Sequence, residues 1–270
     1  MKTNVNGILI FMLLNLLIFQ SAYAQEGVKA IERLKCKIVY DNYANKKGLK
    51  SDWGFSCLIE GTEKKILFDT GARSKVLSKN IKGLKIKTDK IDAIVISHDH
   101  YDHTGGLMGL LESNKDLIVY LPAEYSAKRL SEISEMGTTA IMCPDLMELC
   151  DNVYLSGTMG TSVKEQALVI KTVKGLMVIT GCSHPGIADM LEQISRKLKE
   201  PVYMVFGGFH MHSFSKEETE EVIKRMKAVG VQKCGATHCT GDKQIAWFKE
   251  AFGKDFIKLG VGKTVLFSAN

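Results

Sequence analysis

Three histidines and two aspartates lie within six consecutive residues of the stretch ISHDHYDHTGG, at positions 96–106. In the spacing H-x-H-x-D-H, His98 and His100 can bind one metal ion while Asp102 and His103 bind a second. So many titratable groups packed together would be difficult to stabilise without a cation. The stretch therefore predicts a site for two divalent metal ions, with zinc expected and manganese or iron as alternatives.

The later histidines are candidates for the remaining ligands, because three of them follow predicted strands. His184 stands in GCSHPG, His210 in GGFH and His238 in HCTG. Ligands gather outside the carboxyl ends of strands in α/β sheets, so these side chains should converge with residues 98–103. We expect His184 and His238 to be metal ligands. His210 is either a ligand or a catalytic residue that stabilises an oxyanion or a phosphate oxygen, and His212 should be exposed.

The strands and helices that must position these residues can be predicted from the hydrophobic periodicity, which changes along the chain. Short alternating or β-branched runs predict strands at residues 36–40, 55–60, 65–69 and 91–97, with a hairpin across Gly61-Thr62. Further strands at 175–180, 202–206, 231–237 and 263–267 alternate with amphipathic helices. Strands followed by strand–helix–strand units predict an α/β fold with two sheets covered by helices.

The N-terminus predicts export. An apolar run at residues 8–19 follows Lys2 and is closed by Ala22-Tyr23-Ala24, a small-x-small cleavage pattern. The run is shorter than the about 20 apolar residues that a bilayer span needs, so we expect no stable membrane anchor. The sequence thus predicts a cleaved signal peptide over residues 1–24, a single domain over 25–270, and a periplasmic or secreted protein.

Charge and cysteine content constrain the partners and the disulfides. The formal net charge is +6, but no Lys/Arg block appears, so we expect a small and possibly anionic substrate rather than nucleic acid. Nothing in the composition indicates an oligomeric state. The seven cysteines leave at least one unpaired, and Cys143 with Cys150 is a possible bridge.

Two sets of motifs also resemble a known family. Residues 97–103, SHDHYDH, together with the upstream FDTG at 68–71, resemble the metallo-β-lactamase-fold superfamily from about residue 35 to the C-terminus. GCSHPG, GGFH and HCTG resemble its subgroup named after 7,8-dihydropterin-6-methyl-4-(β-D-ribofuranosyl)aminobenzene-5′-phosphate synthase. The resemblance implies a four-layer αββα sandwich with a dinuclear site on its rim. It also implies that Asp69 is a structural aspartate that supports the histidine loop.

The chain departs from the superfamily pattern at three places. The G-H-x-x-G-H-type loop and the bridging aspartate of many members are absent in that form. His184 is our candidate replacement, and Cys182 and Glu165 are further candidates, although Glu165 is expected to be a solvated strand-edge residue. Asp52-Trp53 stands where the subgroup commonly has a Glu-His pair. A substrate contact that this pair makes in the subgroup is therefore not assigned to this chain.

The segment 107–160 is long for the core fold. It is expected to cover the metals and to set the substrate specificity. Its residues include Met142 and Met147, for which a place in the core is favoured over a place in a lid.

The function expected from two metals is hydrolysis. A pair of cations lowers the pKa of bound water from about 16 toward 7, so metal-bound hydroxide can attack an ester, a phosphodiester or a related bond. Asp102 would hold one metal and orient the water or accept its proton. The sequence thus predicts an exported metal-dependent hydrolase.

Two alternatives of other classes remain open. One is a transferase resembling the pterin synthase, in which the metals activate a diphosphate leaving group and Lys50, Arg73 and Lys75 supply a basic cradle. The other is a redox or sensor protein with dinuclear iron. Cleavage of β-lactams is a weaker expectation, since fold does not settle substrate.

Overall fold

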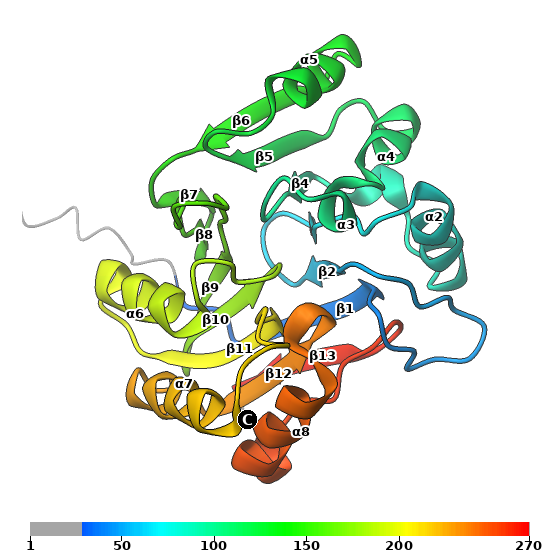
Figure 1. The fold of residues 1–270 in the computed structure, drawn as a ribbon. Helices are drawn as coiled ribbons and strands as arrows, with labels where there is room; N and C mark the ends of the chain where they lie inside the picture. The colour runs from blue at the N-terminus through cyan, green and yellow to red at the C-terminus, as the bar shows by residue number, and fades with distance from the viewer. Residues whose placement is uncertain (1–28, 270) are drawn as a thin grey trace, which may run out of the picture.

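The structure is a computed structural model that describes residues 29–269 (Figure 1). The expected signal peptide at residues 1–24 lies outside the described residues, so it stays a prediction. Among residues 29–269, none of the helices has the length and apolar character that a membrane span requires.

A seven-stranded sheet carries the first half of the chain and the last strand. Its order is β13-β1-β2-β3-β4-β5-β6. The strands are β1 (Arg33–Tyr40), β2 (Ser56–Glu60), β3 (Ile66–Phe68), β4 (Ala93–Val95), β5 (Ile118–Pro122), β6 (Thr139–Cys143) and β13 (Thr264–Ser268). The pairs from β13 to β3 are antiparallel and those from β3 to β6 are parallel. The predicted hairpin between β2 and β3 is confirmed.

A six-stranded sheet carries most of the second half. Its order is β12-β11-β10-β9-β8-β7. The strands are β7 (Met147–Cys150), β8 (Val153–Leu155), β9 (Leu168–Thr172), β10 (Gly175–Thr180), β11 (Val202–Gly208) and β12 (Lys233–Thr237). Strands β10, β11 and β12 are parallel, as the alternation of strands and helices predicts.

Helices cover the outer face of each sheet. They are α2 (Ser74–Gly83), α4 (Leu107–Ser113) and α5 (Ala127–Glu135) on the first sheet, and α6 (Ile187–Leu198), α7 (Lys216–Ala228) and α8 (Asp242–Phe252) on the second. The helix α7 begins at a capping box, because the Ser215 hydroxyl accepts a hydrogen bond from the Glu218 N–H and the Glu218 carboxylate accepts one from the Ser215 N–H.

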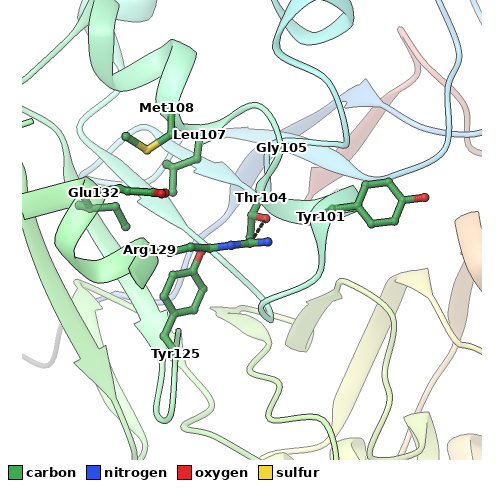
Figure 2. A pocket seen from close by; sticks show the side chains of 9 residues that line it. Tyr101, Thr104, Gly105, Leu107, Met108, Tyr125, Arg129 and Glu132 are labelled. Atoms are coloured by element: carbon green, nitrogen blue, oxygen red, sulfur yellow. Dashed lines mark hydrogen bonds between the residues drawn. The ribbon is translucent and has the colours of Figure 1, made fainter. Parts of the chain in front are cut away.

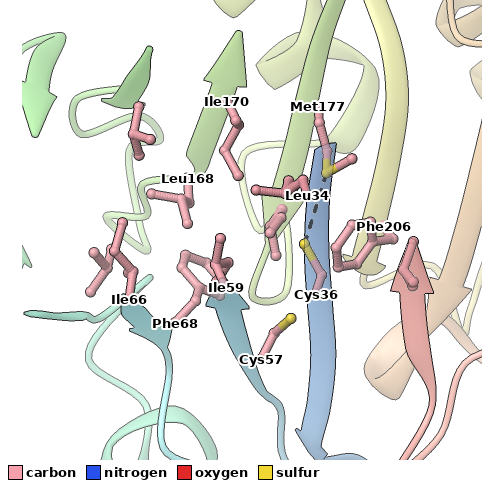
Figure 3. Close-up of a cluster of buried hydrophobic side chains, with 14 of the residues drawn as sticks. Leu34, Cys36, Cys57, Ile59, Ile66, Phe68, Leu168, Ile170, Met177 and Phe206 are labelled. Carbon is pink, nitrogen blue, oxygen red and sulfur yellow. Dashed lines mark hydrogen bonds between the residues drawn. The ribbon is translucent and has the colours of Figure 1, made fainter. Parts of the chain in front are cut away.

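Three clusters of buried apolar side chains pack between these layers. Cys36 and Phe68 of the first sheet lie in one cluster with Met177 and Phe206 of the second sheet, as Figure 3 shows. A second cluster lies between the six-stranded sheet and α6, α7 and α8, and a third between the seven-stranded sheet and α2, α4 and α5. The predicted four-layer αββα sandwich is thus confirmed.

The segment 107–160 contributes mainly to the sheets. Strands β5 and β6 extend the first sheet and β7 and β8 extend the second, so the segment crosses from one sheet to the other. Its loop at residues 122–125 borders a cavity with His100, so this part of the segment lies next to a candidate ligand. The expectation that the segment covers the metals and sets the specificity stays a prediction.

The cysteines form no disulfide in the described part of the chain, which contains all seven. Each of them is buried, including Cys143 and Cys150. The bridge considered for that pair is therefore not formed.

Candidate metal centre

The candidate ligands lie in loops that follow four strands. His98 and His100 follow β4, His184 follows β10, His210 follows β11 and His238 follows β12. Directly after His100, the short helix α3 (Tyr101–Thr104) carries Asp102 and His103. Both sheets therefore supply side chains to one place, as the position of ligands at the carboxyl ends of strands predicts.

Three histidines form the first donor group. The ligand atoms of His98, His100 and His184 all lie within 4.8 Å of one another, and His98 Nε2 is 3.1 Å from His100 Nδ1. Burial lowers the pKa of His98 and of His100, and lowers that of His184 to about 4. These imidazoles are therefore neutral at pH 7, so each has a nitrogen lone pair that can bind a cation. The buried Nε2 of His184 also has no hydrogen-bond partner, so the group fits a cation.

A carboxylate, two histidines and a thiol form the second donor group. His238 Nε2 lies 3.2 Å from both Asp102 Oδ2 and His103 Nε2, and His103 Nε2 lies 3.2 Å from Cys182 Sγ. Burial would raise the pKa of Asp102, but hydrogen bonds from His103 and His238 hold it well below its usual range. Burial lowers the pKa of His103, but the negative charges of Asp69 and Asp102 outweigh this effect and raise the pKa to about 10.

The two donor groups are neighbours. The ring centroids of His98 and His103 are 4.2 Å apart. Nitrogen, oxygen and sulfur donors in two adjacent sets fit two divalent ions of the zinc type. The structure thus brings together all six residues predicted as ligands, and it adds Cys182 to the second group.

Asp69 supports the histidine loop. Its carboxylate is fully buried, accepts hydrogen bonds of 2.7 Å from the N–H and the hydroxyl of Ser97, and lies 2.7 Å from His103 Nδ1. The contact with Nδ1 favours a proton there and leaves Nε2 of His103 facing the donor group. This geometry agrees with the supporting role that the resemblance implies.

Asn42 gives His238 a similar support that the sequence did not reveal. Its Oδ1 lies 3.0 Å from His238 Nδ1 and its Nδ2 donates to the His238 carbonyl oxygen. The same Oδ1 accepts a hydrogen bond from the Gly54 N–H. Nearby, the half-exposed ring of Trp53 lies 5.1 Å from the His238 ring. No local pattern could have indicated Asn42, because it contacts a residue 196 positions away.

Glu165 is a buried residue, so its prediction as a solvated strand-edge residue is wrong. One carboxylate oxygen accepts hydrogen bonds of 2.8 Å from the N–H groups of Cys182 and Ser183, and the other accepts one of 2.8 Å from His184. The backbone turns away from the sheet after β10, so these donors have no strand partner and require another acceptor. Glu165 therefore fixes the loop that places His184 and Cys182.

His210 lies at the edge of the site. It is exposed, and its ring centroid is 4.3 Å from that of His184. Its ligand atom also lies within 4.8 Å of those of Cys182 and Cys239, and a hydrogen bond with Cys239 raises the pKa of His210. His212 is exposed, as predicted.

A small cavity behind α3 shows how α5 holds the histidine loop (Figure 2). Arg129 crosses this cavity and donates a hydrogen bond to the Thr104 hydroxyl. The same guanidinium lies 2.6 Å from Asp99 Oδ1, and the Ser126 N–H donates to Asp99 Oδ2. No candidate ligand lines the cavity. The ion pair of Arg129 with Asp99 nevertheless anchors Asp99, which stands between His98 and His100 in the sequence.

Comparisons with known proteins agree with this arrangement. The family model of the metallo-beta-lactamase superfamily matches residues 54–133. The chain is 31% identical, over 89% of its length and 99% of the relative, to 7,8-dihydropterin-6-methyl-4-(beta-D-ribofuranosyl)-aminobenzene-5′-phosphate synthase of Methanocaldococcus jannaschii.

Solved structures show the same fold. Tm1679, described as a metal-dependent hydrolase of the beta-lactamase superfamily, is 30% identical and superposes with a TM-score of 0.73 over 86% of this chain and 98% of the other. A metallo-beta-lactamase fold protein of Bacillus subtilis, 17% identical, superposes with a TM-score of 0.64 over 86% of this chain and 99% of the other. With the histidine loop, its supporting aspartate and the two donor groups in place, the chain belongs to the metallo-β-lactamase superfamily, in the subgroup that resembles the dihydropterin phosphate synthase.

Proposed function

We propose that the chain is a metal-dependent hydrolase that acts on an ester, a phosphodiester or a related bond of a small substrate. The observation that carries this proposal is the convergence of His98, His100 and His184 beside Asp102, His103 and His238. Two adjacent donor groups suit two divalent cations, for which we propose zinc, with manganese or iron as alternatives.

The residues around the donor groups have defined tasks in such a reaction. When bound, a pair of divalent cations lowers the pKa of water so that hydroxide is available at neutral pH, and it offsets negative charge on an oxyanion. Asp102 stays ionised and can accept a proton or orient the attacking water. Asp69 and Asn42 fix the ring orientation of His103 and His238 through their Nδ1 atoms.

We assign His210 a role in charge stabilisation. Its exposed ring lies beside His184, and its ligand atom groups with Cys182 and Cys239 rather than with the two donor groups. A hydrogen bond with Cys239 raises its pKa, which favours a positive charge. A cation in that place would stabilise an oxyanion or a phosphate oxygen. His210→Ala should keep the metal content and lose turnover, and unchanged turnover would remove this assignment.

A transferase is the second candidate, favoured by the 31% identity to the synthase over 89% of the chain. In such a reaction the metals would assist departure of diphosphate, which calls for a basic cradle. Of the three residues considered for it, Arg73 forms a bidentate pair with Asp52 at 2.5 Å, and Lys50 and Lys75 are exposed. The pairing neutralises Arg73, and the two lysines are exposed rather than held in a cradle, and so we favour hydrolysis.

Product analysis on defined metal forms tests the proposal. The full chain would be loaded with zinc, manganese or iron and incubated with bis(p-nitrophenyl) phosphate and with p-nitrophenyl esters. Metal-dependent release of p-nitrophenol that is lost in His184→Ala and kept in His212→Ala would support hydrolysis. Release of diphosphate from a sugar diphosphate without hydrolysis of the esters would favour the transferase. Bound iron with oxygen-dependent spectral changes and no turnover would favour the redox or sensor alternative.

We also propose export to the periplasm or the medium, supported by the apolar run and by Ala22-Tyr23-Ala24. Cell fractionation and the N-terminal sequence of the processed protein test this proposal. Recovery of the uncut chain in the cytoplasm would contradict it.

A further inference from the structure

A cavity of about 290 Å³ adjoins the candidate metal centre. His184 and His210 line it on the side of the first donor group. Ile187, Phe209 and Phe214 supply apolar walls, and Phe214 is one of the few large apolar side chains that remain exposed, at 36%. The cavity therefore continues from the metal centre into apolar surroundings.

The walls of this cavity are held in place without a ligand. Gln244 donates hydrogen bonds to the carbonyl oxygens of His212 and Phe214, and the Phe209 N–H donates to the Thr240 hydroxyl. The buried Phe209 ring also packs against Phe248 at 5.3 Å. A pocket that is formed in advance has a small ordering cost on binding.

The two residues of permanent charge that line the cavity, Arg225 and Asp189, form an ion pair with each other. The Arg225 guanidinium lies 2.5 Å from Asp189 Oδ1 and 2.8 Å from Glu192 Oε2. It has no free charge to offer an anionic group in the cavity. Apolar walls combined with a paired arginine favour an uncharged, apolar occupant.

We propose that this cavity binds an apolar arm of the substrate, an alkyl or aryl group next to the bond on which the metal centre acts. The inference rests on the proposed hydrolytic function and adds a substrate class to it. The metal centre binds the polar, reacting group, and the arm extends past His184 and His210 between α6 and α7. The preferred substrates are therefore esters or phosphoesters that carry a hydrophobic substituent.

Straight-chain carboxylates provide a direct probe of binding to the zinc-loaded full chain. Calorimetry would measure the Kd of acetate, butyrate, hexanoate and octanoate. Burial of one methylene is worth about 0.8 kcal/mol, so the affinity should rise about fourfold per methylene until the arm fills the cavity.

Two variants locate the binding of the arm, with a matched control. Ala188 is buried in α6 and lines the cavity, so Ala188→Leu should remove the gain with chain length. Ala251 is exposed on α8 and is the control, so Ala251→Leu should keep the gain in affinity with chain length. Phe214→Ala removes an exposed wall without filling the core. It should weaken octanoate several-fold and leave acetate unchanged.

The outcomes separate this inference from the proposed function. Equal affinity along the series, or a gain that persists in Ala188→Leu and Phe214→Ala, would overturn the inference even if esters are hydrolysed. A gain that the two variants abolish, in a protein that hydrolyses no ester with any metal, would overturn the proposed function and leave the apolar cavity as a binding site.

Discussion

The carboxylate of Glu165 accepts a hydrogen bond of 2.8 Å from the backbone N–H of His184. Its other oxygen accepts the N–H groups of Cys182 and Ser183. One fully buried acid thus fixes a loop that supplies a histidine to the first donor group and a thiol to the second.

Glu165→Gln should destabilise the fold and weaken metal binding. An amide group presents N–H donors where the loop needs acceptors, so at least one buried backbone donor loses its partner. The loss should be about 1–3 kcal/mol in the free energy of unfolding. Denaturant unfolding and metal content measure the effect. Glu250→Gln, at an exposed position on α8, is the control, and equal behaviour of the two variants would contradict the role of Glu165.

Cys182→Ser should weaken zinc binding at the second donor group, because a hydroxyl is a poorer zinc ligand than a thiolate. Cys234→Ser is the matched control, since Cys234 is also buried but belongs to none of the candidate metal groups. Competition with a chromogenic chelator measures the affinity. If the two variants lose affinity equally, Cys182 is not a ligand.

Gly181→Ala should disrupt the support of the histidine loop. A Cβ at this position would lie 2.1 Å from Ser97 Oγ and 3.1 Å from Asp69 Oδ2. The Ser97–Asp69 contact must then shift, so both the melting temperature and the metal content should fall. The control is Gly109→Ala in α4, where the nearest atom is the flexible Ser74 hydroxyl at 3.0 Å. A Gly181→Ala protein with full metal content would show that the loop tolerates this change.

Arg129→Ala should lower metal affinity without unfolding the protein. The substitution removes the ion pair that anchors Asp99 between two candidate ligands. Loss of such supporting contacts typically costs 10- to 100-fold in metal affinity or activity, so a loss of about tenfold is expected. Arg129→Lys should restore part of it, and Arg196→Ala, at an exposed position on α6, should have no effect. An unchanged metal affinity in Arg129→Ala would mean that α5 plays no part in the site.

The histidines could be predicted from the sequence because of a rule of sheet geometry. His184, His210 and His238 each follow a parallel strand, and parallel strands bring their carboxyl ends to one edge. The loop at residues 98–103 could be predicted from its density of ligand-type side chains alone.

The supporting residues could not be predicted, because their partners are distant or are backbone atoms. Glu165 contacts N–H groups, which leave no pattern of residue types, and Asn42 contacts His238 across 196 positions. The segment 107–160 was expected to be a cover because it is long for the core fold, and its strands β6 and β7, which are short and only partly buried, were not recognised. Short edge strands carry a weak periodic signal.

The central claim is that two adjacent donor groups each hold one metal ion. Mass spectrometry of the purified chain tests it most directly, with His184→Ala for the first group and His238→Ala for the second. We predict two divalent ions per chain in the unaltered protein and a loss of about one ion in each variant. Full metal content in both variants, or no bound metal in the unaltered chain, would contradict the account.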